Sequence, residues 1–234
     1  MKKIDIKWYD EGARQARKDG KQIVVIDILR ATTFEVHALN LGAKAIVPVK
    51  DIREALMLKK VYKESLTAGE VGGEPIPGFD LDPSPSNLEK QKVEGKVIIH
   101  KSTCGTKCIV DSGKDAIIGS LLNARSIGEY LPKVDKDVAI VASGNSCREF
   151  SLEDFLGAGA IIYYSSMEHT DQARAAYLAF KNSYDNLKEI IMSGKSRSKL
   201  MKKGLMKDIE LASSLNTANV IPIYDQKVVT ALKL

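Results

Sequence analysis

Four polar clusters follow apolar, β-branched runs, and each carries residue types that can bind a phosphate group or a metal ion. The first is DILRATT, from Asp27 to Thr33, directly after the run IVVI. Asp27 offers a carboxylate, Arg30 a guanidinium that can hold two phosphate oxygens, and Thr32 or Thr33 a helix cap. Backbone N–H groups at such a helix start favour a bound anion. A turn residue, a surface ion pair and a plain cap are the alternative interpretation.

The second cluster is acidic and lies in the Gly- and Pro-rich segment GEVGGEPIPGFDLDPSP, from Gly69 to Pro85. Glu70 follows a short apolar run, and Glu74, Asp80 and Asp82 come later. Mg²⁺ is typically held by one or two carboxylates, water molecules and phosphate oxygens. Glycine and proline are too dense here for a helix or a central strand, and long loops in compact domains are usually functional or disordered. We interpret the segment as functional, with a solvated acidic loop as the alternative.

The third cluster, KSTCGT from 101 to 106, follows the run VIIH, and the fourth, ASGNSCR from 142 to 148, follows another apolar run. Small hydroxyl residues around a glycine allow backbone amides to approach an anion closely. An ordinary strand-to-helix turn would have the same composition. Arg148 and Asp154 both lie beyond the end of the run before the fourth cluster, although Ser151 and Asp154 also form a capping-box variant that needs no function.

Several other chemistries are disfavoured. The chain has no G-x-x-x-x-G-K-[ST] nucleotide loop and no cysteine followed six positions later by arginine. The three cysteines, Cys104, Cys108 and Cys147, lack the second half of a zinc site, and their odd, low number fits a reducing compartment better than a disulfide framework. The histidines have no motif context, and we interpret them as structural.

The elements that must position these clusters alternate along the chain. Apolar, β-branched runs predict strands at 23–27, 45–49, 66–68, 97–100, 116–118, 138–142 and 220–224. Helical periodicity predicts helices at 32–41, 52–63, 121–130, 152–158 and several between 172 and 215. Alternation of this kind predicts an α/β fold with three layers and a mostly parallel or mixed sheet. Ligands of such sheets bind beyond the carboxyl ends of the strands, where the four clusters lie.

Bulk properties narrow the function further. The 234 residues are 44% hydrophobic and 6% aromatic, with a net charge of +5. We expect a single domain over 1–234, with two sub-lobes divided near 130–150 as an alternative. The low aromatic content and the lack of a nucleic-acid motif argue against a nucleic-acid partner. No stretch reads as a signal or a membrane span, so we expect a cytoplasmic protein that binds no membrane. A homodimer is a reasonable expectation.

Together the clusters resemble the 2-phosphosulfolactate phosphatase family of coenzyme M biosynthesis. The matching blocks are VVIDILRATTF at 24–34, GE at 69–70, GFDLDPSP at 78–85, STCGT at 102–106, GSLLNA at 119–124 and FSLEDFLGAGAI at 150–161. They occur in the family's order and span about the first two thirds of the chain. Three departures concern the substrate. Cys104 stands where the family usually has Asn, Asp82-Pro83 stands where it usually has Gly-Asn, and the fourth cluster, ASGNSCREF at 142–150, is atypical.

The resemblance implies a Mg²⁺-dependent phosphatase that hydrolyses (R)-2-phospho-3-sulfolactate, a small phosphate ester, to 3-sulfolactate and phosphate. Asp27 and Glu70 would hold the metal. The phosphoryl group would be bound by Arg30 and by the backbone near Thr32, Thr33, Thr103, Gly105 and Thr106. The sulfonate or carboxylate would be bound by Lys101, Lys107 or Arg148. Asp80 or Asp154 would act as the general acid or base. Direct attack of Asp27 on phosphorus stays open. The alternatives are a phosphatase on another small anionic ester and a non-catalytic anion-binding module.

Overall fold

The chain folds into alternating strands and helices. The computed structural model describes residues 2–232, with the side chain of Lys199 excepted. The first elements are β1 (Lys3–Trp8), α1 (Tyr9–Lys18), β2 (Gln22–Ile26), α2 (Ala31–Asn40), β3 (Ala45–Val49), α3 (Ile52–Val61), β4 (Leu66–Val71) and β5 (Glu74–Pro75). The middle elements are η1 (Pro85–Lys90), β6 (Val97–Lys101), α4 (Gly105–Ser112), β7 (Ala116–Gly119), η2 (Leu121–Asn123), α5 (Ala124–Tyr130), η3 (Leu131–Lys133), β8 (Val138–Ala142) and α6 (Leu152–Tyr163). The last are β9 (Glu168–His169), α7 (Asp171–Ser183), η4 (Tyr184–Asn186), α8 (Leu187–Ser193), α9 (Lys195–Lys202), α10 (Met206–Ala212), β10 (Pro222–Asp225) and β11 (Val228–Ala231).

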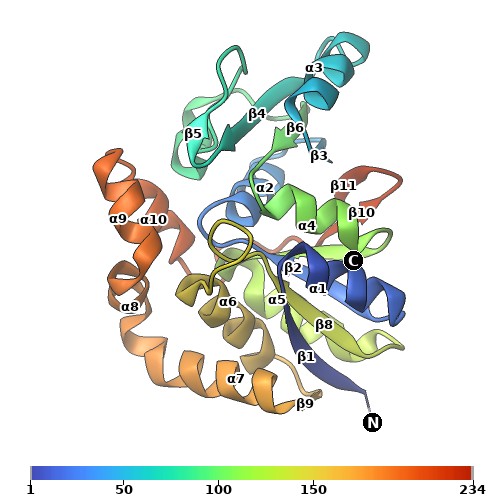
Figure 1. Ribbon diagram of the computed structural model, residues 1–234, viewed down its shortest axis with the longest axis vertical. Helices are drawn as coiled ribbons and strands as arrows, with labels where there is room; N and C mark the ends of the chain where they lie inside the picture. The colour runs from blue at the N-terminus through green and yellow to red at the C-terminus, as the bar shows by residue number, and fades with distance from the viewer. Residues whose placement is uncertain (1, 233–234) are drawn as a thin grey trace.

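The strands form one mixed, eleven-stranded sheet in the order β5-β4-β6-β3-β11-β10-β7-β2-β8-β1-β9. A first block, β4, β6 and β3, is internally parallel, and so is a second block, β7, β2, β8 and β1. The C-terminal hairpin β10–β11 joins the two blocks through antiparallel pairing with β7 and β3. With helices on both faces (Figure 1), this architecture confirms the predicted three-layer α/β fold.

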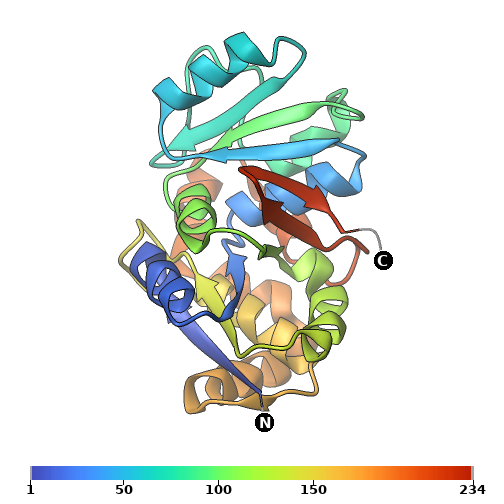
Figure 2. The same ribbon diagram turned by 90° about the vertical axis from the view of Figure 1, so that its right-hand side faces the viewer.

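The two blocks run in opposite directions along the sheet, because three antiparallel pairings in succession separate β3 from β7. In a flat sheet their carboxyl ends would therefore point to opposite edges. Sheets twist, however, and this one turns strongly between the blocks. Figure 2 shows β3 and β4 running across the view while β1 and β8 run steeply along it. The carboxyl ends of both blocks can consequently face one shared space.

Alternate side chains of the second block enter opposite layers, as the pleat of a strand requires. Val24 and Ile26 pack in one apolar cluster with α5, α6 and α7, whereas Ile23 and Val25 pack in another with α1 and α4. Helix α2 is buried from Ala31 to Leu39, so the predicted start of this helix lies inside the protein. None of the helices in residues 2–232 is both long and apolar enough to cross a membrane.

The predicted elements match the structure best where apolar runs are uninterrupted. Strands β3 and β8 have the predicted bounds, and the other predicted strands are present within a few residues. The sequence patterns do not predict β1, α1, β5, α4, β9 or β11. In β1 charged residues alternate with Ile4 and Ile6, which are both buried. This alternation is typical of a strand with one buried face, and it contains no continuous apolar run.

Candidate functional site

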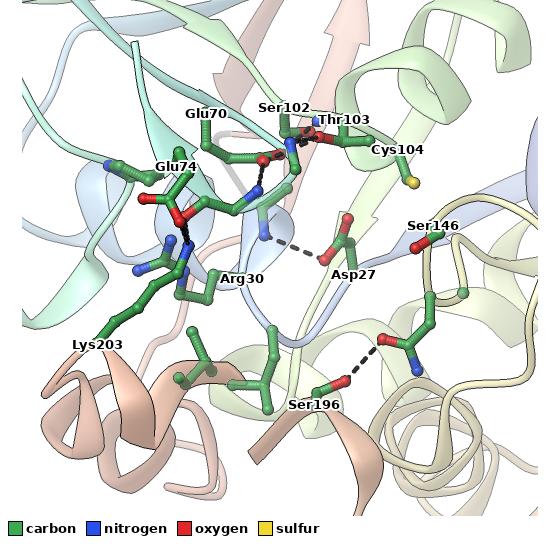
Figure 3. A pocket seen from close by; sticks show the side chains of 18 of the residues that line it. Asp27, Arg30, Glu70, Glu74, Ser102, Thr103, Cys104, Ser146, Ser196 and Lys203 are labelled. Atoms are coloured by element: carbon green, nitrogen blue, oxygen red, sulfur yellow. Dashed lines mark hydrogen bonds and ion pairs between the residues drawn. The ribbon is translucent and has the colours of Figure 1, made fainter. Parts of the chain in front are cut away.

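A cavity of about 550 Å³ lies at the carboxyl ends of both blocks (Figure 3). Its walls come from the segments that follow β2, β6 and β8, from the hairpin β4–β5, and from α9 and the turn after it. The polar and charged residues that line it are Asp27, Arg30, Glu70, Glu74, His100, Ser102, Thr103, Asn145, Ser146, Ser196, Lys202 and Lys203. Asp27, Arg30 and Glu70, which are far apart in sequence, thus share one cavity.

Asp27 directly follows β2 and is held by the turn that leads into α2. The Thr32 hydroxyl accepts from the Asp27 N–H at 2.9 Å and contacts its carbonyl oxygen at 3.0 Å, while the Ala31 N–H donates to Asp27 Oδ1 at 3.2 Å. A Cβ atom at Gly105 would lie 2.8 Å from Asp27 Oδ2 and 2.5 Å from the Ala31 Cβ. Only glycine at 105 therefore allows α4 to begin against this carboxylate.

The Asp27 carboxyl has an unusual proton affinity. Burial raises its pKa, the carboxylates of Glu70 and Glu153 also raise it, and the N–H of Ala31 and the charge of His100 oppose them, so that the resulting pKa is about 7. A group with this pKa exchanges a proton near neutral pH. The same repulsion would disappear if a cation neutralised the carboxylates.

Glu70 lies in β4, within the first block. Its Oε1 accepts from the Thr103 N–H, and its Oε2 accepts from the Gly73 N–H and, at 2.8 Å, from the Thr103 hydroxyl. Lys101 donates to the Glu70 carbonyl oxygen at 3.1 Å. These bonds fasten the end of β4 to the segment after β6, so Glu70 both faces the cavity and holds its wall together.

Arg30 is the buried cation of the site, with only 8% of its surface exposed. It lines the main cavity and also a smaller one of about 240 Å³ beside it. Its Nη1 donates to Asp208 Oδ2 at 2.8 Å, from α10. Asp208 lies outside the segments that the sequence analysis singled out.

Other predicted phosphate-binding residues are buried supports rather than cavity-lining groups. The Thr33 hydroxyl donates to the Ile28 carbonyl oxygen at 2.8 Å. Thr106 and Ser102 exchange hydrogen bonds, because the Thr106 N–H donates to Ser102 Oγ at 2.9 Å and the Ser102 N–H to Thr106 Oγ1 at 3.0 Å. Of this predicted group, Thr103 does line the cavity.

The candidates for acid–base catalysis lie outside the cavity lining. Asp80 Oδ2 accepts from the Thr67 N–H at 2.7 Å and pairs with Lys59 at 3.0 Å; burial raises its pKa, but these two partners outweigh that effect and lower it. Asp154 is buried, and its two oxygens accept from the N–H groups of Ile28 and Gly144 at 2.8 and 2.9 Å. Burial and the nearby Asp27 charge raise the Asp154 pKa well above its usual range.

The cations predicted to bind the sulfonate or carboxylate of the substrate also lie outside the cavity lining. Lys101 is buried beside Glu70. Burial lowers the pKa of Lys101, although the charge of Glu70 acts in the opposite direction and raises it. Lys107 pairs with Asp10 at 2.7 Å, and Arg148 is exposed and does not line the cavity. The cations that do line it, besides Arg30, are Lys202 and Lys203. They lie in the region between 172 and 215, for which the sequence predicts helices but no cavity-lining role.

The expectation that the cysteines form no disulfide is wrong. Cys104 and Cys147 form one, with their Cα atoms 5.3 Å apart, and Cys108 stays free and buried. Their 43-residue separation gives no local signal of pairing. They meet because the segments after β6 and β8 converge on the cavity, where Cys104 is part of the wall.

The carboxylates fit a weakly ligated divalent cation rather than a closed metal centre. Within residues 2–232 no group of three or more His, Cys, Asp and Glu side chains is arranged to hold a metal. Mg²⁺ needs only one or two carboxylates in addition to water and phosphate oxygens. Across the described chain Asp27 Oδ2 has no hydrogen-bond partner, and Glu70 Oε1 accepts a single bond, so each carboxylate keeps a free lone pair.

The fold and the cavity define an α/β protein that brings carboxylates and a guanidinium together at the carboxyl ends of its strands. The family model for 2-phosphosulpholactate phosphatase matches residues 9–227. A probable 2-phosphosulfolactate phosphatase of Carboxydothermus hydrogenoformans is 40% identical over 94% of this chain and 92% of its own length. One of Clostridium acetobutylicum is 35% identical over 95% of this chain and 97% of its own. The chain therefore belongs to the 2-phosphosulfolactate phosphatase family, whose members are phosphoric monoester hydrolases.

Proposed function

We propose that this protein is a cytoplasmic, Mg²⁺-dependent phosphatase that hydrolyses (R)-2-phospho-3-sulfolactate to 3-sulfolactate and phosphate, in coenzyme M biosynthesis. The observation that carries the proposal is the convergence of Asp27, Arg30 and Glu70 on one cavity in a chain of this family. A phosphate monoester dianion repels a nucleophile, so its hydrolysis requires neutralised phosphoryl charge and an aligned attacking group.

Asp27 and Glu70 would hold the ion through the lone pairs that the protein leaves free. When bound, Mg²⁺ supplies positive charge to the phosphoryl oxygens. Arg30, which reaches the same cavity from the turn before α2, binds phosphoryl oxygens with the N–H groups that Asp208 does not take. Lys202 and Lys203 are the other cations that line the cavity, and Lys203 pairs with Glu74 at 2.6 Å; these two lysines are the groups that would receive the sulfonate or carboxylate of the substrate.

The cavity volume supports one alternative substrate class. At about 550 Å³ it has room for an ester larger than a three-carbon acid. A phosphatase acting on another small anionic phosphate ester therefore remains the second candidate.

A panel of phosphate esters, assayed for released phosphate with Mg²⁺ and with a chelator, tests the proposal. We expect metal-dependent release from 2-phospho-3-sulfolactate with the highest kcat/KM of the panel. Release from other esters only would favour the second candidate, and no metal-dependent release from any ester would refute both.

The matched variant is Asp27→Asn, which keeps the shape of the side chain and removes its charge. We expect its rate to fall by about 10³-fold or more, because both the ion and the charge at the reacting centre are lost. Near-normal turnover by a folded Asp27→Asn protein would contradict the assignment of Asp27.

A further inference from the structure

Arg30 reaches the cavity with its guanidinium held from behind by a buried carboxylate. The Arg30 Nη1–Asp208 Oδ2 distance is 2.8 Å, and Asp208 is 0% exposed. Across residues 2–232 this is the one hydrogen bond of the Arg30 side chain to protein. Because the guanidinium is planar and the Arg30 side chain is buried, this bond restricts the directions in which the remaining donors point.

The second oxygen of Asp208 has a separate set of partners. Asp208 Oδ1 accepts from the Ser84 hydroxyl at 2.6 Å, from the Ser86 hydroxyl at 2.7 Å and from the Ser86 N–H at 3.1 Å. Three donors on one oxygen orient the carboxylate and leave Oδ2 for Arg30. A continuous series of hydrogen bonds therefore connects the Ser84–Ser86 segment through Asp208 to Arg30.

The buried ion pair between Asp208 of α10 and Arg30 is not needed merely to hold α10 in place. Removing two charges from water costs several kcal/mol per ion, and an apolar contact of the same shape is often as stable. A neutral acceptor would also satisfy Ser84 and Ser86. The charge on Asp208 has a specific use only towards Arg30, the buried cation that lines both cavities.

We infer that Asp208 is a positioning residue for the reaction: it fixes the plane of the Arg30 guanidinium so that the free N–H donors face a phosphoryl group in the cavity. The inference rests on the proposed phosphatase function. It also assigns a role to the Ser-Pro part of the GFDLDPSP block, since Ser84 supports Asp208 and through it the phosphate clamp.

A double-mutant cycle tests the inference. Arg30→Ala should lower kcat/KM by about 10²–10³-fold, as loss of one transition-state donor does. Asp208→Asn should lower it by about 10–100-fold, the usual effect of losing an outer partner of a site residue. If Asp208 acts through Arg30, the double variant should be no slower than Arg30→Ala alone. Multiplied effects in the double variant would overturn the inference.

Glu210→Gln is the control for the charge change. Glu210 lies on the same helix, is half-exposed and pairs with Lys188 at 3.0 Å on the surface. We expect this variant to keep wild-type kcat and KM. Thermal melts of all variants show whether each is folded, and an Asp208→Asn effect confined to the melting temperature, with kcat/KM unchanged, would also overturn the inference.

Binding of inorganic phosphate, measured by calorimetry, separates this inference from the proposed function because it requires no turnover. We expect Arg30→Ala and Asp208→Asn each to weaken phosphate binding by about tenfold, again without adding in the double variant. That result would support the positioning role even if every ester in the panel were inert. A wild-type protein that binds no phosphate, or an Asp208→Asn protein that binds it normally, would count against it.

Discussion

Asp27 is a carboxylate whose surroundings oppose its charge. Burial, together with the Glu70 and Glu153 carboxylates, raises its pKa to about 7. In the unfolded chain the same group would ionise near pH 4. Between about pH 4 and pH 7 the Asp27 carboxyl is protonated in the folded protein and ionised in the unfolded chain. Raising the pH through this range therefore lowers the free energy of unfolding of the metal-free protein.

Substitution of Asp27 should therefore affect stability and activity in opposite directions. We expect metal-free Asp27→Asn to melt at a higher temperature than wild type at pH 8, because Asn needs no charge in this site. The difference should shrink towards pH 5, where Asp27 is neutral in the folded protein. Thermal melts in chelator at several pH values measure it. A difference that does not change with pH would show that Asp27 titrates normally.

Mg²⁺ supplies the control for this measurement. Because a bound cation favours the ionised carboxylate, it should raise the melting temperature of wild type at pH 8 more than that of Asp27→Asn. Equal shifts in the two proteins would place the cation elsewhere.

At the scale of elements, two segments that line the cavity are joined covalently. Cys104 lies between β6 and α4, directly before the helix, and Cys147 lies in the loop after β8. The same loop is joined to α9, because Ser196 Oγ donates to Asn145 Oδ1 at 2.8 Å. The disulfide thus adds a covalent link to a loop that hydrogen bonds also hold and that contributes to the cavity wall.

Loss of the disulfide should lower the free energy of unfolding. Closing a loop of 43 residues contributes at most about 4 kcal/mol in the chain-entropy model. We expect a reductant such as dithiothreitol to shift the urea midpoint of wild type to lower concentration and to leave that of the Cys104→Ser/Cys147→Ser variant unchanged. An identical midpoint for wild type with and without reductant would contradict this prediction.

At the scale of the whole molecule, the site depends on the C-terminal hairpin. Glu70 belongs to the first block of strands and Asp27 follows the second, and β10–β11 is the pairing that joins the blocks. Val229 of β11 pairs with Ile46 of β3 and is 0% exposed. A defect in this hairpin should therefore separate the two halves of the cavity as well as destabilise the protein.

Val229→Asp tests this dependence. A buried, unpaired charge should lower the free energy of unfolding by about 3–5 kcal/mol or more and abolish phosphate release. Thr230→Asp is the matched control, because Thr230 is the next residue of β11 and is exposed; we expect its stability and activity to be near wild type. Urea unfolding and the phosphatase assay measure both. Equal behaviour of the two variants would refute the bridging role of the hairpin.

The fold class and the local position of the site can be predicted from patterns along the chain. Uninterrupted apolar runs such as β3 and β8 have a local signal, because a strand buried on both faces must be apolar throughout. The clusters at Asp27 and Glu70 were recognisable because polar residues directly after such runs mark strand ends. Half-buried β1 and the short strand β11 were not assigned, because neither is a continuous apolar run.

Which of these residues meet depends on how distant segments pack against one another. The twist between two oppositely directed blocks brings Cys104 to Cys147, and helices packed near the chain end bring Lys203 to the cavity and Asp208 to Arg30. Asp80 and Thr106, which looked equivalent to Asp27 and Thr103 in sequence, point to local partners instead. Spacing along the chain specifies the period of a strand or a helix, but contacts between distant segments arise from the packing of all the elements together.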